Sequence, residues 1–487
     1  MELQLLNHPY RYECENLCRL FFPYSPVRVV ESLSCGKEPW ALAAVEECSG
    51  GSKVFVQVSD GERTVEKAGQ EEALTEYAVT NRLYAAFTEL TGQRPAWGML
   101  TGIHPVKLLR QYAEERGEEA GVEKFRSRCH VTEARASLAL RTLQAQRPVT
   151  AALLENDWSL YISIPFCPTR CAYCSFISQD VKQAKKLMEP YFALLLEELA
   201  KTAEVTEALG LHLVSVYIGG GTPTTLSAEQ LSLLCERVHS LFDLSRCPEF
   251  TVEAGRPDTI TPEKLLALKQ GGVTRISINP QSLSDQVLEN IGRRHTAQDV
   301  LDAFALAKQA GFEDINCDLI VGLPGDSPAG FANTLEGVLG LGASNVTVHS
   351  LALKRAARIE AEGGTELHKK QQETAAMMDF SIRRLTEEGY VPYYLYRQTR
   401  MAGNLENTGW AKPGSICRYN IYTMDECTSV IACGAGGVTK LKDPYSGRLE
   451  RIFNFKYPHE YISRHREILL RKDGVTQLYE QFRQRLH

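Results

Sequence analysis

The sequence predicts an α/β fold built on a parallel sheet, and three observations indicate it. From residue 158 onward, short apolar runs rich in β-branched residues recur along the chain. Amphipathic helical stretches separate these runs, and such an alternation is typical of a parallel sheet that is closed or partly closed into a barrel. Polar and glycine-containing motifs follow several of the runs directly. Catalytic groups of such folds gather at the C-terminal ends of the strands, so these motifs mark the expected site.

The expected elements are recognised by their periods of 2 residues in strands and 3.6 in helices. Six strands are expected, at 159–164, 213–218, 249–252, 274–278, 315–321 and 345–349. The helices between them are expected near 184–208, 227–243, 261–269, 297–311 and 328–341.

The segments on either side of this region differ in texture, which predicts three domains. Residues 1–150 are expected to form an α+β domain that carries no motif with a nameable chemistry. Its expected elements are a strand at 53–58, helices at 70–92 and 131–146, and a Pro- and Gly-containing loop at 95–105. The barrel is expected over 151–365. A helix at 366–388 then opens a mixed helical region, 366–487, which we expect to complete the substrate site.

Charge and composition exclude several functional classes. With a formal net charge of -6, the 487-residue chain has no basic footprint, so nucleic-acid binding is not expected. No stretch approaches the ~18 uninterrupted apolar residues that span a bilayer, so membrane insertion is not expected. The first residues lack a basic segment followed by an apolar run, which is the pattern of a signal peptide. A cytoplasmic location is therefore expected.

The chain has 14 cysteines, which is many for a cytoplasmic protein. Disulfides are rare in that compartment, where clustered cysteines more often bind metal or react. Only Cys167, Cys171 and Cys174 have a tight three-member spacing. Cys14 and Cys18 also stand four residues apart, but no third partner follows them, so we expect two ordinary half-buried helix residues. The scattered cysteines are expected to be small buried apolar residues.

The three clustered cysteines lie on the loop that follows the first barrel strand. Their thiolates can hold three corners of a [4Fe–4S] cube, a cluster that takes cysteine ligands by preference. One iron then stays open for a chelating ligand, such as the amino and carboxylate groups of methionine. Zinc is the alternative, because thiolates also suit zinc. Structural zinc sites, however, usually combine a CxxC pair with a second pair or with two histidines, and none follows at suitable spacing.

The CxxxCxxC spacing after a first barrel strand resembles the radical S-adenosylmethionine (SAM) superfamily. The resemblance implies a partial (β/α)6 barrel with two cofactors, a [4Fe–4S] cluster and SAM. It also implies that a low-potential electron donor reduces the cluster, which then cleaves SAM to methionine and a 5′-deoxyadenosyl radical. That radical removes a hydrogen atom from the substrate, while the protein positions and insulates the cofactors.

Four segments resemble one branch of this superfamily, the oxygen-independent coproporphyrinogen III dehydrogenase family. They are YISIPFCPTRCAYCSF, YIGGGTPT, IGRRHT and DLIVGLPGD. The family includes the dehydrogenase HemN, the haem chaperone HemW and the HemZ type, and the resemblance covers about 158–440. Residues 1–150 and the tail motifs look most like the HemZ type. The resemblance therefore implies a tetrapyrrole substrate or ligand.

The resemblance also implies which residues bind the cofactors. Tyr161 is expected beside SAM and is the candidate catalytic residue, and Tyr173 is expected to pack on SAM. The residues expected on the methionine end of SAM are Gly220, Gly221 and Thr222. The residues expected around its nucleoside and carboxylate are Glu253, Gln281, Arg293, Asp318 and Ala352. Of these, Arg293 could meet the carboxylate with paired hydrogen bonds.

One departure from the family separates the possible functions. The dehydrogenase has a fourth cysteine two positions after the third, where this chain has Phe176, as the chaperone branch does. We favour oxidative decarboxylation of two propionates of coproporphyrinogen III, which gives protoporphyrinogen IX. A haem carrier on the same scaffold is the alternative that Phe176 favours, and another radical enzyme of tetrapyrroles stays open. The candidate cations for substrate carboxylates are Arg397, Arg400, Lys412 and Arg418.

Overall fold

The computed structural model describes residues 1–23, 25–33, 39–174, 176, 178–351, 365–398 and 404–484. The chain divides into two compact units. Unit 1 contains Met1–Leu140 and Arg397–Leu405, and unit 2 contains Arg141–Tyr396 and Glu406–His487. The sheet of unit 1 has five strands and that of unit 2 has eleven.

Unit 1 is an α+β structure whose sheet has the order β2-β1-β3-β4-β5. The strands are β1 (Glu2–Leu6), β2 (Arg28–Val30), β3 (Trp40–Cys48), β4 (Gly51–Ser59) and β5 (Thr64–Glu71). The helices are α1 (Arg11–Phe21), α2 (Glu76–Thr91), α3 (Pro105–Arg116), α4 (Glu118–Cys129) and the start of α5 (Glu133–Ala151). β1 pairs in parallel with β2 and β3, whereas β3, β4 and β5 form antiparallel hairpins.

Two expectations for unit 1 were wrong in detail. The helix expected from residue 70 begins at Glu76, because residues 64–71 pair with β4 as a strand. Thr75 starts this helix by accepting a hydrogen bond from the Ala78 backbone N–H, which satisfies one otherwise unpaired helix donor. Cys14 and Cys18 lie on α1 but are fully buried rather than half-buried, since they belong to the apolar core of this unit.

Unit 2 is built on a sheet of order β14-β15-β13-β12-β11-β10-β9-β6-β16-β17-β18. Its parallel strands are β6 (Asp157–Ile164), β9 (His212–Gly220), β10 (Phe250–Glu253), β11 (Arg275–Ser277), β12 (Asp314–Val321) and β13 (Asn345–Ser350). All six strands expected from the sequence are confirmed, and they lie side by side in chain order. The described strands form an open sheet with β14 and β18 at its edges, so the partial barrel is confirmed.

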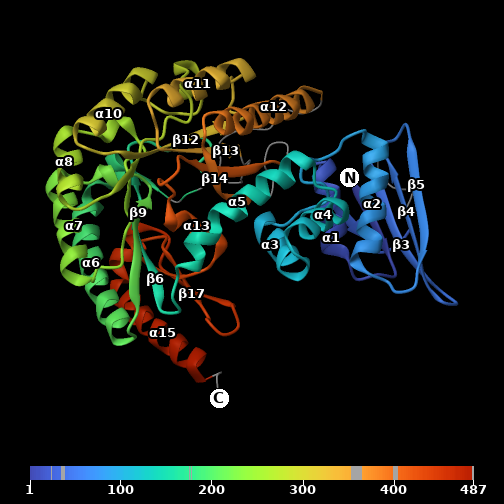
Figure 1. Ribbon diagram of the computed structural model, residues 1–487, viewed down its shortest axis with the longest axis horizontal. Coiled ribbons are helices and arrows are strands. Elements are labelled where there is room, and N and C mark those ends of the chain that lie inside the picture. The colour runs from blue at the N-terminus through green and yellow to red at the C-terminus, as the bar shows by residue number, and fades with distance from the viewer. Residues whose placement is uncertain are drawn as a thin grey trace. The chain divides into compact units, whose positions relative to one another are not determined.

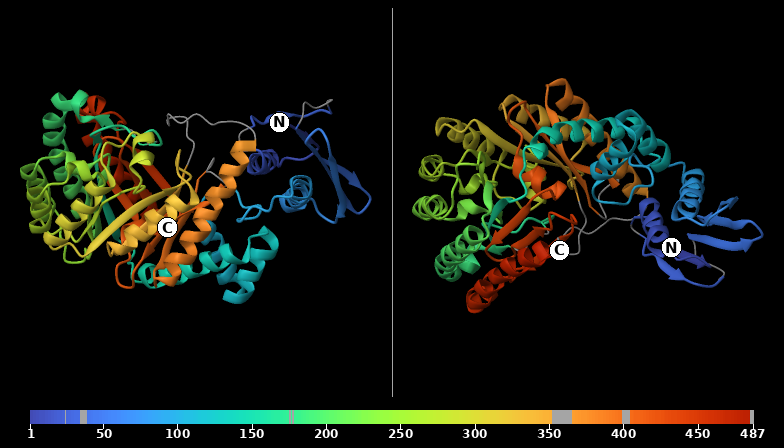
Figure 2. Two further views of the ribbon diagram at one scale, coloured as in Figure 1. Left: turned by 90° about the horizontal axis from the view of Figure 1, so that it is seen from above. Right: turned by 60° about the horizontal axis from the view of Figure 1, so that its bottom comes forward.

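Helices cover the convex face of this sheet, where Figure 1 shows them as an arc from green to orange. They are α6 (Val181–Ala208), α7 (Ala228–Leu241), α8 (Pro262–Gln270), α10 (Ala297–Gln309), α11 (Pro328–Gly340) and α12 (Thr365–Glu387). The short α9 (Asp285–Asn290) packs with Leu323 and Tyr173. Capping boxes fix two starts, Ser227 with Gln230 at α7 and Thr296 with Asp299 at α10. In both views of Figure 2 the green and yellow helices stay on one side of the strands.

The chain after residue 366 extends the same sheet at both edges. Its strands are β14 (Val391–Arg397), β15 (Glu406–Ala411), β16 (Ser429–Cys433), β17 (Val438–Lys442) and β18 (Leu449–Phe453). Its helices are α13 (Arg418–Asp425), α14 (Pro458–Ser463) and α15 (His465–Gln484). β15 runs antiparallel to β13, whereas β16 pairs in parallel with β6. In the described part of the chain, no helix combines the length and apolar composition needed to cross a membrane.

The concave face of the sheet is filled by α13, which Figure 1 shows inside the arc near β6. Its Tyr419 stacks on Tyr217 with ring centroids 4.4 Å apart and on Tyr161 at 6.3 Å. The start of this helix is fixed because the Glu249 carboxylate accepts hydrogen bonds from the backbone N–H groups of Arg418 (2.6 Å) and Tyr419 (3.0 Å). The tail thereby supplies an aromatic wall to the interior of the partial barrel.

Candidate cofactor site

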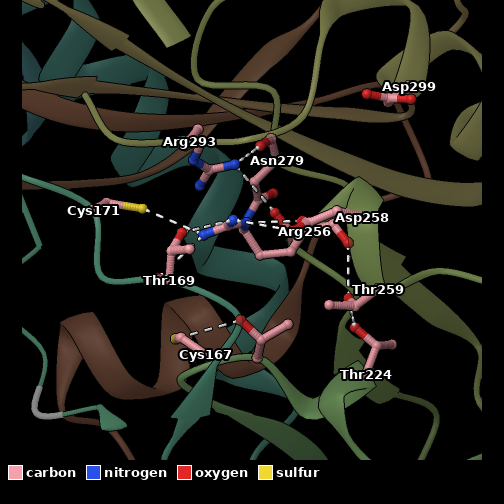
Figure 3. Close-up of polar contacts among 12 residues, drawn as sticks. Cys167, Thr169, Cys171, Thr224, Arg256, Asp258, Thr259, Asn279, Arg293 and Asp299 are labelled. Atoms are coloured by element: carbon pink, nitrogen blue, oxygen red, sulfur yellow. Dashed lines mark hydrogen bonds and ion pairs between the residues drawn. The ribbon is translucent and has the colours of Figure 1, made fainter. Parts of the chain in front are cut away.

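The cysteine loop lies at the C-terminal edge of the parallel strands. It is closed by a short parallel pair, β7 (Phe166–Cys167) with β8 (Gln179–Asp180). Its backbone is fixed to the segment after α9, because the Ala172 N–H donates to the Ile291 carbonyl at 3.0 Å. Cys171 is buried, whereas Cys167 and Cys174 are half-buried. Figure 3 shows Cys167 and Cys171 with the polar side chains around them.

The donor set of this loop fits an iron–sulfur cluster better than a single ion. Within the described ranges, no three His, Cys, Asp or Glu side chains converge on a point where one metal ion could sit. The thiolates of a cubane cluster each bind a different iron, so they need not converge. Hydrogen-bond donors already face two of the sulfurs, Thr222 Oγ1 at 3.5 Å from Cys167 Sγ and Arg256 Nη1 at 3.6 Å from Cys171 Sγ. Such second-sphere donors are typical of cluster sites.

The glycine turn packs directly against the root of the cysteine loop. The Gly221 N–H donates to the Ile164 carbonyl at 2.8 Å, and the Thr222 N–H donates to the Phe166 carbonyl at 2.7 Å. A Cβ added at Gly221 would lie 2.6 Å from the Phe166 oxygen, and Gly220 has φ +107°. The sequence suggests glycines that clear space for a ligand. In the structure these two glycines also let one backbone approach another.

Glu253 lies at the end of β10, next to Tyr217 and Asp318. Tyr217 Oη donates to Glu253 Oε1 at 2.7 Å. Burial raises the pKa of Glu253 to about 7, against the bond from Tyr217 and with a smaller raising effect of Asp318. This carboxyl group therefore changes between its protonated and ionised forms near neutral pH.

Asp318, two strands further on in β12, has the opposite electrostatic character. Burial alone would raise its pKa, but His349 and the Asn316 amide, which donates at 2.8 Å, bring the pKa below its usual value. His349 Nε2 lies 3.8 Å from Asp318 Oδ2. Two neighbouring carboxyl groups thus have pKa values displaced in opposite directions, a pattern typical of functional sites.

Gln281 occupies the loop after β11 in a conformation that is unusual for a residue with a side chain. Its φ is +68°, and its backbone is held by hydrogen bonds with Asp318 and Ile320. Its side-chain oxygen is buried and has no hydrogen-bond partner among the described residues, as is true of Asn279 Oδ1. A strained backbone with an unpaired buried polar atom is a recognised feature of ligand sites.

Arg293 and Tyr173, both expected at SAM, contact each other. Arg293 Nη2 donates to Tyr173 Oη at 3.0 Å, while Nη1 donates to the backbone oxygen of Asn279 at 2.5 Å. Although burial opposes it, Tyr173 and Cys171 raise the pKa of Arg293 above its usual value. Both Nη atoms of Arg293 thus donate hydrogen bonds within the protein. Its Nε is buried and has no partner among the described residues.

Other expected residues make different contacts or fall outside the described ranges. Ala352 and Arg400 fall outside the described residues. Arg397 belongs to unit 1, where its guanidinium donates to the backbone oxygens of Leu100 and Asn404. Lys412 lies over the Tyr390 ring, 5.5 Å from its centroid.

The structure adds three residues that the sequence analysis did not single out. Arg256 follows Glu253 by three positions, so its place after a strand end was a usable signal. Tyr217 lies on β9, two positions before the first glycine of the glycine turn. Tyr419 reaches the site only because α13 enters the barrel, and no local pattern indicates such a long-range contact.

Comparison with known proteins supports the resemblance to the radical SAM superfamily that the sequence motifs indicate. Residues 161–338 match the model of the radical SAM superfamily. The oxygen-independent coproporphyrinogen-III oxidase-like protein HemZ of Bacillus subtilis is 37% identical over 378 residues, which cover 77% of this chain and 75% of that protein. The chain belongs to this radical SAM family. Its cofactors are accordingly a [4Fe–4S] cluster and SAM.

Two further family members are similar over a large part of the chain. The heme chaperone HemW of Bacillus subtilis is 33% identical, over 57% of this chain and 70% of its own length. A solved structure of coproporphyrinogen III oxidase (HemN) from Escherichia coli, described as a radical SAM enzyme, covers 70% of this chain and 81% of its own. Its TM-score is 0.49 at 22% identity.

Proposed function

We propose that this chain is a radical SAM enzyme of haem biosynthesis that converts two propionate groups of coproporphyrinogen III to vinyl groups, giving protoporphyrinogen IX. The observation that carries the proposal is the gathering of the cysteine loop, the glycine turn and the polar residues Glu253, Gln281 and Asp318 near the C-terminal ends of neighbouring strands. The name of the HemZ relative supports the tetrapyrrole substrate.

Cys167, Cys171 and Cys174 are the proposed ligands of the cluster. When bound, the reduced cluster and SAM together supply the radical that removes a hydrogen atom from a propionate. The low-potential electron donor is a separate partner in this proposal. Gly220, Gly221 and Thr222 hold the methionine end of SAM, with Tyr161 and Tyr173 beside it.

The chain's own polar groups bind and orient the ligands. The unpaired Gln281 oxygen accepts a hydrogen bond from an N–H or O–H group of SAM. Asp318 stays ionised at neutral pH because its pKa is lowered, and it accepts from hydroxyl groups such as those of the ribose. Glu253 holds or releases a proton near neutral pH and can face the cationic amino group. The stacked rings of Tyr161, Tyr217 and Tyr419 exclude water on the inner side.

Haem binding without decarboxylation is the second candidate, and a specific residue favours it. The Phe176 ring stands where the dehydrogenase has its fourth cysteine, and it is 66% exposed. The similarity to HemW points in the same direction. Against this, hydrogen abstraction requires only that the radical is held against the propionate carbon, so a thiol at this position is not obligatory.

The test is an anaerobic incubation of the reconstituted chain with SAM, a reductant and coproporphyrinogen III, followed by mass spectrometry. We expect 5′-deoxyadenosine together with mono- and divinyl products. The matched variant is Phe176→Cys, which introduces the fourth cysteine. We expect vinyl products from the unmodified chain as well, without this thiol. Deoxyadenosine without vinyl product in the unmodified chain, together with tight stoichiometric haem binding, would replace the dehydrogenase by the carrier.

A further inference from the structure

Arg256 is a buried cation that lies against the cysteine loop. It is 4% exposed and stands directly before the short helix η2 (Pro257–Thr259). Its Nη1 donates to Cys171 Sγ at 3.6 Å and to the Thr169 carbonyl at 3.4 Å. Its Nη2 donates to Thr169 Oγ1 at 3.1 Å. Figure 3 shows the guanidinium lying between the loop and Asp258.

Asp258 holds the opposite edge of this guanidinium. Its two oxygens accept from Arg256 Nε at 3.1 Å and from Nη2 at 3.2 Å. This two-point contact fixes the plane of the guanidinium, so that Nη1 points to the sulfur. The Asp258 side chain keeps 27% of its surface exposed, and solvent therefore weakens the field of its negative charge.

The charges that face Cys171 are mainly positive. Arg256 carries a positive charge, and the buried Arg293, which also interacts with Cys171, is a second cation. His295 lies near both and adds no charge, because burial and the two arginines lower its pKa to about 4. Asp258 is the opposing charge, and it lies across the guanidinium from the sulfur.

We propose that Arg256 sets the reduction potential of the cluster through its hydrogen bond and positive charge at Cys171. The inference rests on the proposed role of Cys171 as a ligand. Reduction adds one electron to the cluster and so increases the negative charge on its sulfurs. A cation in hydrogen-bond contact stabilises that reduced state and raises the potential. Arg256 is thus a positioning residue that acts through the cluster.

The test is a redox titration of the reconstituted chain without SAM, followed by electron paramagnetic resonance. In Arg256→Met we expect the equilibrium constant for one-electron reduction to fall about tenfold, a decrease of about 59 mV in midpoint potential. Arg256→Lys keeps the positive charge without the planar guanidinium, and its midpoint potential should decrease less. Asp258→Asn keeps one oxygen that can accept from Arg256 Nε, removes the opposing charge and should raise the potential. An unchanged potential in a loaded Arg256→Met variant overturns the proposal.

The matched control is Arg246→Met, which breaks another arginine–aspartate pair, with Asp157 at the opposite end of β6. Its potential should equal that of the unmodified chain, and an equal decrease in both variants would contradict a local effect. If Arg256→Met does not bind a cluster, the midpoint potential of Asp258→Asn is the test. A potential that is not higher than that of the unmodified chain then overturns the proposal. Failure of the unmodified chain to load a cluster would instead reject the proposed function itself.

Discussion

The Tyr217 phenol on β9 donates a 2.7 Å hydrogen bond to the Glu253 carboxyl group on β10. The two strands are parallel neighbours, with Tyr217 opposite Thr251. Both side chains therefore meet at the carboxyl edge of the sheet. Because burial raises the pKa of Glu253 to about 7, this contact places a proton that exchanges near neutral pH inside the proposed SAM site.

The first prediction concerns the pH dependence of stability in the cofactor-free chain. The pKa of Glu253 is raised from 4.5 to about 7 in the folded state, so between these values only the folded state keeps the proton. The free energy of unfolding should therefore fall as pH rises through this window, by at most about 3 kcal/mol. Glu253→Gln should remove this fall and be the more stable protein at pH 8. Denaturant unfolding at several pH values measures it.

Tyr217→Phe is the matched variant for that experiment. It removes the hydrogen bond that lowers the pKa of Glu253 and keeps the stacked ring. The decrease in stability should then extend to higher pH than in the unmodified chain. Identical pH profiles for all three proteins would show that Glu253 titrates at its ordinary value.

A second prediction concerns Asp318, whose contribution to the free energy of unfolding should change with pH in the opposite direction. The pKa of Asp318 is lowered in the folded state, so its contribution to stability is present above its usual pKa of 3.8 and lost as pH falls through the folded value. Asp318→Asn should be less stable than the unmodified chain at pH 7, and the difference should shrink in acid. A constant difference over the whole pH range would contradict this assignment.

A third prediction separates binding from folding at Gln281. Gln281→Gly removes the buried amide but tolerates φ +68°, so the backbone should keep its shape. We expect SAM affinity of the reconstituted protein to fall about two- to tenfold, which corresponds to one hydrogen bond of about 0.5–1.5 kcal/mol. Asn7→Gly, at another residue of positive φ in unit 1, is the control and should leave affinity unchanged. Equal affinities in all three proteins would remove Gln281 from the site.

A fourth prediction concerns the buried ion pair that fixes the tail to the barrel. Lys472 Nζ lies 2.9 Å from Glu198 Oε1, and both side chains are almost fully buried. Glu198 also accepts from Tyr461 Oη at 2.6 Å and from the Gly434 N–H at 2.7 Å. Lys472→Met leaves this carboxylate without its cation and should cost about 3–5 kcal/mol of unfolding free energy.

The exposed pair Arg464–Glu467 offers the matched comparison, since solvent screens both charges and Arg464→Met should cost much less than Lys472→Met. Denaturant unfolding of both variants at one pH measures the difference. Similar decreases in unfolding free energy in the two variants would show that the buried Glu198–Lys472 pair contributes no more to stability than the exposed pair.

Local periodicity was sufficient to predict the six barrel strands and the longer helices between them, but not the short α9. Apolar runs such as 315–321 are short and β-branched, and they are confirmed as strands because each lies between two others in the sheet. The α7 and α10 helices carry capping boxes that are visible in the sequence. β5 was missed, because its polar residues 64–71 are held as a strand by pairing with β4.

The site was predicted only as far as its residues follow strand ends. Thr222 and Gln281 follow a strand, Glu253 ends one and Asp318 lies in the C-terminal half of another, so a sequence pattern can find them. Tyr419 cannot be found in this way, because it reaches the site through the hydrogen bonds that fix α13 to Glu249, 170 residues earlier in the chain. The position of Arg256 after a strand end was a usable signal, but its contact with Cys171, 85 residues away, appears only in the structure.

The central claim is that the loop from Cys167 to Cys174 holds the [4Fe–4S] cluster. The most direct measurement is the content of iron and sulfide per chain after anaerobic reconstitution, read with the brown charge-transfer absorption of the cluster. We predict one [4Fe–4S] cluster in the unmodified chain and in the control Cys48→Ala/Cys247→Ala, and none in Cys167→Ala/Cys171→Ala/Cys174→Ala. A triple variant that still binds a full cluster would contradict the account.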